Sequence, residues 1–301
     1  MKKEKPLPKS ERIERLHRRN LELAQNHKRD IYVDNPEFLV YHWSGKAAAF
    51  SPATGETAAS ESERINLGDH NCRIDTGGGY PFVKDMPSKV SGFSYDPINF
   101  ARDYAFFLDH SPVAVHPYEK ITGEFYWQLD EARYFKYPEE NQELGFKARR
   151  MGAGGMSLAH TCPDLSIGLE LGWSGLLHKI RGYKEKYKSF DNQNSYEYLC
   201  AAEIVCESVI RYVERYAEKT KVLAEQEKDP EIKEIYETVS KNCRNLVEKA
   251  PSTFIEALQW INFFQIAERI IGHGNGYGRM DQLLIGFYRN DIKKGILTKE
   301  Q

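Results

Sequence analysis

Apolar residues recur every three or four positions over most of the chain after residue 96, which is the period of a helix with one buried face. The pattern predicts helices over residues 97–110, over residues 196–227, after the break at Asp229-Pro230, and from Thr253 onward. Thr253 followed by Glu256 is a capping-box signature, in which two side chains close the first turn of a helix. The sequence therefore predicts a largely helical protein.

The first third of the chain has a different pattern. Residues 1–30 read as a charged helix with a patchy apolar face, and residues 31–97 are irregular and rich in turn-forming residues. Within them, the glycine run at residues 75–80 could cradle a phosphate, but no lysine follows it and no clear strand precedes it. We interpret this run as a connecting loop.

Glycines occupy every second position around His273, just before the last apolar helix; they are Gly272, Gly274, Gly276 and Gly278. Because glycine adopts positive φ freely and lets backbone approach other atoms closely, this density predicts a shaped loop. The helix that follows begins near Arg279, with Asp281 two residues later. These two side chains are placed to lock the loop by charge-assisted hydrogen bonds.

A second histidine, His160, also follows a glycine-rich stretch, which contains Gly152, Gly154 and Gly155. Pro163 and Asp164 come shortly after it. Proline suits the first turn of a helix, and aspartate offsets the positive end of the helix dipole. The pair therefore predicts a helix start directly downstream of His160.

Composition narrows the class of protein. The 301 residues carry a formal net charge of −2 with acidic and basic residues interspersed, which argues against a nucleic-acid surface or a basic membrane anchor. No apolar run approaches the roughly 18 residues that a membrane span needs. The five cysteines are odd in number and irregularly spaced, which fits free thiols in a reducing compartment. We expect a cytoplasmic protein.

Several motifs together resemble one family. The chain reads G-H-x-x-x-x-G-R-M-D-Q from Gly272, then F-Y-x-x-D-I-x-x-G-x-L-T, and it carries H-x-x-P-D at His160 and T-F-x-E-A-L-Q at Thr253. These motifs resemble, in order and spacing, those of the glycyl radical enzymes, the family of pyruvate formate-lyase and the radical diol dehydratases. The chain departs from the family's pattern at Ala159, Leu165 and Gly274. The resemblance divides the chain into an unmatched N-terminal region, 1–95, and a pyruvate formate-lyase-like part, 96–301.

The resemblance implies an α/β fold, of which these residues are the N-terminal, largely helical portion of a ten-stranded α/β barrel. It implies a radical dehydratase or lyase, nearer the diol dehydratase branch, that cleaves a carbon–heteroatom bond of a small polar substrate. The family's thiyl cysteine and radical glycine motifs do not occur in this sequence. We therefore expect no catalytic residue here, and expect the chain to be incomplete, whether truncated, split or a remnant, and inactive alone.

The family resemblance also implies cofactors and partners. No cofactor is expected on this chain, because the glycyl radical belongs to the C-terminal part and is installed by an activase that uses S-adenosylmethionine and a [4Fe–4S] cluster. The expected partners are a small polar substrate, this activase and a second copy in a homodimer, working anaerobically, with no nucleic acid and no membrane.

His160 and His273 occupy the positions at which the diol dehydratases bind substrate hydroxyls, so the resemblance implies that both bind substrate. An imidazole can donate or accept a hydrogen bond and titrates near neutrality, which suits that role. Each histidine could instead cap neighbouring backbone. Asp164, Arg279 and Asp281 are expected to be structural residues near the site.

Three alternatives stay open. The pairs His70-x-Cys72 and His160-x-Cys162 could hold a zinc ion, although this spacing is not a recognised zinc signature and we expect no metal site. The chain could be a non-catalytic helical scaffold. It could also belong to a carbon–carbon lyase of the formate acetyltransferase type.

Overall fold

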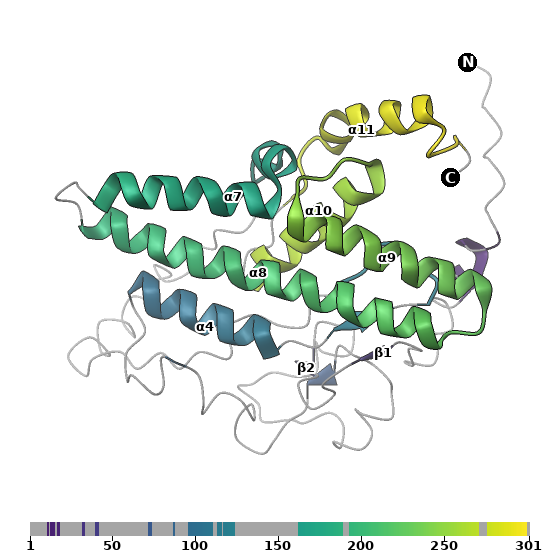
Figure 1. Ribbon diagram of the computed structural model, residues 1–301, viewed down its shortest axis with the longest axis horizontal. Helices are drawn as coiled ribbons and strands as arrows, with labels where there is room; N and C mark the ends of the chain where they lie inside the picture. The colour runs from purple at the N-terminus through teal and green to yellow at the C-terminus, as the bar shows by residue number, and fades with distance from the viewer. Residues whose placement is uncertain are drawn as a thin grey trace, which may run out of the picture.

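The computed structural model describes part of the chain. The described residues are 11, 13–15, 17–18, 32–33, 40–41, 72–73, 87, 96–110, 113–115, 117–123, 162–188, 193–270 and 276–299. They form a mainly helical body (Figure 1). Its helices are α4 (Pro97–His110), α7 (Leu165–Lys188), α8 (Gln193–Gln226), α9 (Pro230–Glu248), α10 (Phe254–Arg269) and α11 (Met280–Lys294).

The long helix α8 is the centre of the packing. It contacts α4, α7 and α9, and Figure 1 shows α4 along one side of it with α7 and α9 along the other. Helix α10 packs against α7, α9 and α11. Every buried apolar face predicted from the three-to-four-residue period therefore meets a neighbouring helix, which is how such a face is removed from water.

Aromatic side chains fill the middle of this body. The indole of Trp173 on α7 stacks on that of Trp260 on α10, with ring centres 4.8 Å apart, and Phe264 stacks on Trp260 at 5.3 Å. On the other side of α10, Phe263 contacts Tyr212 and Tyr216 of α8. These rings join α7, α8 and α10 into one core.

The helix boundaries agree with those predicted from sequence. Helix α4 covers residues 97–110, and Asp229 caps α9 by accepting hydrogen bonds from the backbone of the two residues that follow Pro230. Thr253 caps α10 through the backbone N–H of Glu256. One detail differs, because the Glu256 carboxylate accepts the backbone N–H of Ser252 as well as its hydroxyl.

The described residues between 31 and 97, a stretch that the sequence shows as irregular, include short strands. They contribute three two-residue strands, β1 (Tyr32–Val33), β2 (Val40–Tyr41) and β3 (Cys72–Arg73), while β4 (Ala114–Val115) follows α4. β1 pairs antiparallel with β4, and β2 pairs antiparallel with β3. Two residues are too few to show the two-residue period of a strand in sequence. No barrel is formed by the described residues.

Side-chain amides attach the segment after β4 to α10. Gln259 accepts the backbone N–H of Thr122 at 2.8 Å and donates to its carbonyl at 2.7 Å, so the amide pairs with the backbone as a neighbouring strand would. Asn262 donates to the same carbonyl. Of the helices that the structure describes, none is long and apolar enough to cross a membrane.

Candidate functional site

The segment that leads into α7 is held at its helix start. Asp164 lies just outside the helix and accepts the backbone N–H of Ser166 at 3.0 Å, so it caps the helix from the preceding position rather than from inside the first turn. Leu165, the first helical residue, is 1% exposed. Cys162 and Asp164 are exposed. The buried leucine anchors the helix, and the residues before it lie at the surface.

Residues 276–279, which lead into α11, are exposed. Arg279, at their end, forms an ion pair with Asp281. Arg279 donates two hydrogen bonds to Asp281, at 3.1 Å and 3.0 Å, and both side chains are about 70% exposed. The hydrogen bond from the guanidinium lowers the pKa of Asp281. Gly278 has a φ of +65°, which requires glycine or costs another residue strain.

These two segments meet. A methyl group built on Gly278 would lie 3.9 Å from Cβ of Cys162, an ordinary van der Waals contact. Glycine is therefore favoured at position 278 by the backbone conformation, by about 1–2 kcal/mol over another residue, and not by lack of space. The starts of α7 and α11 are distant in sequence but adjacent in the fold.

The two predicted substrate-binding residues, His160 and His273, lie outside the described residues. His160 is two residues before Cys162, and His273 is five residues before Gly278. The structure thus brings together the described segments that follow each histidine. Of the residues predicted to be structural, Asp164 caps α7, and Arg279 pairs with Asp281 at the start of α11.

Sequence reasoning missed the residue that ties α11 to α10. Asp291 is 2% exposed, and its carboxylate accepts the backbone N–H of Phe254, the first residue of α10, at 2.7 Å. The rings of Phe254 and Tyr288 meet nearby in an edge-on contact. The two helices that flank the His273 loop are therefore joined at their far ends. Asp291 belongs to the F-Y-x-x-D-I run, but a short motif does not show which distant residue its aspartate contacts.

The zinc alternative is untested, because His70 and His160 lie outside the described residues. Among the residues that are described, no group of three or more potential ligands could hold a metal ion. None of the four cysteines with described side chains is in a disulfide, as the sequence predicted. Burial raises the pKa of Cys206 to about 12 and also raises the pKa of Cys243, so both thiols are poor nucleophiles and metal ligands.

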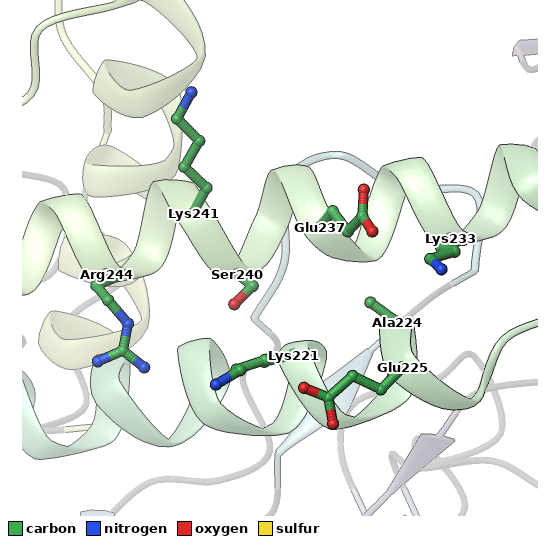
Figure 2. A pocket seen from close by; sticks show the side chains of 8 residues that line it. All are labelled: Lys221, Ala224, Glu225, Lys233, Glu237, Ser240, Lys241 and Arg244. Carbon is green, nitrogen blue, oxygen red and sulfur yellow. The ribbon is translucent and has the colours of Figure 1, made fainter.

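Two hollows lie away from these segments. An apolar groove of about 530 Å³ runs between α4, α7, α8 and α10. A smaller hollow of about 380 Å³ lies between α8 and α9, where Figure 2 shows Lys221 and Arg244 reaching into the space between the helices. Arg244 pairs there with Glu218, and Ser240 donates to a backbone carbonyl. Neither set of lining residues includes a predicted site residue.

The chain is similar to known proteins in both sequence and fold. The model of the pyruvate formate lyase-like family matches residues 116–301. The chain is 32% identical over 145 residues to a (2S)-3-sulfopropanediol dehydratase from Klebsiella oxytoca, a match that covers 47% of this chain and 18% of that enzyme. It is 35% identical over 113 residues to an isethionate sulfite-lyase from Nitratidesulfovibrio vulgaris, covering 36% of this chain and 14% of that enzyme.

The fold is similar to that of a solved protein. A glycyl radical enzyme from Archaeoglobus fulgidus aligns with a TM-score of 0.60 at 20% identity, over 72% of this chain and 35% of that one. This likeness concerns the fold alone. The chain spans less than a fifth of the length of the two curated relatives. The predicted boundary at residue 96 stays a prediction.

Proposed function

Since the chain belongs to the pyruvate formate lyase-like family of glycyl radical enzymes, we propose that it is the N-terminal part of a radical dehydratase or lyase. In this proposal the enzyme cleaves a carbon–heteroatom bond of a small polar substrate. The sulfopropanediol dehydratase and the isethionate sulfite-lyase, by their names, act on compounds of this kind. The remainder of the protein would complete the ten-stranded barrel.

His160 and His273 are the residues proposed to bind substrate. The observation that supports this proposal is that a methyl group built on Gly278 would lie 3.9 Å from Cβ of Cys162. Two residues of chain reach at most about 7 Å and five at most about 18 Å, so the chain length allows both histidines to approach this point. A common cavity for both imidazoles is therefore within reach of the chain.

The proposed role of the histidines is to bind and orient a hydroxyl group. A neutral imidazole donates from one nitrogen and accepts at the other, so it can hold a substrate hydroxyl in a fixed direction. In the remainder of the protein, a glycyl radical would take the hydrogen atom of a cysteine thiol, and the resulting thiyl radical would take a hydrogen atom from the bound substrate. The exposed pair of Arg279 and Asp281 and the cap formed by Asp164 hold the ends of the two segments in place.

The same proposal includes the family's partners. An activase that uses S-adenosylmethionine and a [4Fe–4S] cluster would install the radical, the working enzyme would be a homodimer, and it would act in an anaerobic cytoplasm. This chain would be inactive without the part that carries the thiyl cysteine and the radical glycine.

The test uses the full-length, activase-treated protein under anaerobic conditions, with a panel of diols, hydroxysulfonates and hydroxy acids. His160→Ala and His273→Ala are each expected to lower kcat/KM about tenfold, the loss of roughly one buried hydrogen bond. His178→Ala is the matched control, because this histidine is exposed on α7. Unchanged turnover and affinity in both site variants would remove the assignment.

A further inference from the structure

Helix α7 changes direction at Gly172. Its φ of 65° and ψ of −179° are not helical, so residues 165–171 form a separate first section of the helix. Figure 1 shows these first turns out of line with the rest of α7. The section before the bend is the one that carries Cys162 and Asp164 at its start.

The bend requires glycine for two reasons. The combination of φ and ψ at Gly172 belongs to a region that only glycine populates. A methyl group at this position would also lie 2.7 Å from Cα and 2.8 Å from the backbone N of Ala250, in the link between α9 and α10. Backbone atoms cannot swing aside as a side chain can. Just past the bend, Ser174 donates to the carbonyl of Glu248 at 2.9 Å, which holds α7 against the end of α9.

Both sections of α7 pack against the indole of Trp260. Trp173, directly after the bend, stacks on Trp260, and a methyl group on Gly168, before the bend, would lie only 1.9 Å from the same ring. Leu165 and Leu169 are buried beside it, at 1% and 5% exposed. The angle at Gly172 therefore determines where the first turns of α7 lie on α10.

We propose that Gly172 is a positioning residue for the junction between the starts of α7 and α11. The bend that it permits places Cys162 beside position 278 at the start of α11. A seven-residue section is about 10 Å long, so a change of direction by about 30° moves its tip by about 5 Å. This displacement exceeds the 3.9 Å separation between Cβ of Cys162 and a methyl group built at position 278, so the two positions would no longer be neighbours. The bend at Gly172 would determine the geometry of the proposed substrate site. The relevance of the bend to substrate binding therefore rests on the proposed function.

A disulfide trap measures this geometry without turnover. The 3.9 Å separation between a Cβ at position 278 and that of Cys162 falls within the range of about 3.5–4.5 Å found in disulfides. In the full-length protein, Gly278→Cys is oxidised mildly, and the rate of linkage to Cys162 is followed by peptide mass mapping. Gly172→Ala is then added, with Gly182→Ala as the matched control, because among the described residues no atom lies within 4 Å of a methyl group at Gly182.

Linkage at least tenfold slower with Gly172→Ala, and unchanged with Gly182→Ala, is the expected result. Linkage at the parent rate in folded Gly172→Ala, or none in the parent Gly278→Cys protein, would overturn the proposal. If circular dichroism shows that Gly172→Ala does not fold, Ser174→Ala replaces it, and linkage at least threefold slower is expected; the parent rate would again overturn the proposal.

The activity of the variants separates this proposal from the proposed function. In activated protein that lacks the introduced thiol, the bend variant is expected to raise KM more than it lowers kcat. If the His160→Ala and His273→Ala variants keep full activity while the trap behaves as expected, the proposed function fails and the positioning role of Gly172 stands.

Discussion

Removing the charge of Glu256 tests how α10, the helix that leads to the His273 loop, is fixed at its start. Glu256 is 3% exposed. One carboxylate oxygen accepts the backbone N–H and the hydroxyl of Ser252, both at 2.8 Å, and the other accepts the amide of Asn245 at 2.7 Å. Glu256→Gln keeps the shape of the side chain but replaces one hydrogen-bond-accepting oxygen with an amide NH2 group. That group would face the donors of Ser252 or of Asn245.

The magnitude follows from these contacts. Hydrogen bonds to a charged group contribute about 1.5–3 kcal/mol each and are not additive, so the loss of one oxygen is expected to cost about 2–3 kcal/mol. At about 2.1 cal/mol/K per residue, the Tm of a 301-residue chain falls by about 1.6 °C for each kcal/mol, which predicts a fall of about 3–5 °C. Glu234→Gln is the control, because Glu234 is exposed on α9, and its Tm is expected to stay unchanged.

The pH dependence gives a second check. Burial alone would raise the pKa of Glu256, but the hydrogen bonds from Ser252 and Asn245 outweigh it and lower the pKa below its ordinary value of 4.5. A carboxylate with a lowered folded-state pKa contributes stability that is present above the unfolded pKa and is lost as pH falls through the folded one. The difference in unfolding free energy between wild type and variant should therefore be constant near neutral pH and shrink below about pH 4.5.

Urea unfolding followed by circular dichroism, repeated across this pH range, measures both effects. A variant as stable as the wild type at neutral pH would refute the role given to these hydrogen bonds. A difference that persists undiminished in acid would refute the charge-based explanation.

Two further substitutions separate packing from exposure. Gly168→Ala is expected to lower the unfolding free energy by about 2–3 kcal/mol, because the added methyl group forces Trp260 to move. Gly182→Ala should instead raise the unfolding free energy by up to about 1 kcal/mol, because alanine has the better helix propensity. Equal effects of the two substitutions in urea unfolding would contradict this. Arg279→Ala should leave the urea midpoint unchanged, since its pair with Asp281 is exposed and screened by solvent. A clear loss of stability there would show that the pair does more than shape the loop.

The helices could be predicted from sequence because their signals are local. The break at Asp229-Pro230 indicates where one helix ends and the next is capped. The side chain of Thr253 caps the backbone N–H of Glu256, which is only three residues later. The family's motifs were also readable, since each is a short run at a fixed spacing.

The arrangement of the candidate site was not predictable in this way. The contact of Cys162 with Gly278 and the tie from Asp291 to Phe254 join residues far apart in sequence. The bend at Gly172 depends on the backbone of Ala250, in another connection of the fold. Such contacts are set by tertiary packing, which leaves no periodic trace in one sequence.

We propose that the segments bearing His160 and His273 line one cavity. The most direct measurement is thiol bridging in full-length protein that carries His160→Cys and His273→Cys, with Cys162→Ser to remove the neighbouring thiol. A short bifunctional thiol reagent is expected to link the two introduced thiols in the native protein, with bound substrate slowing the reaction. If each introduced thiol is labelled singly in the native protein and no bridged peptide forms, the two segments do not share a cavity and the account is wrong.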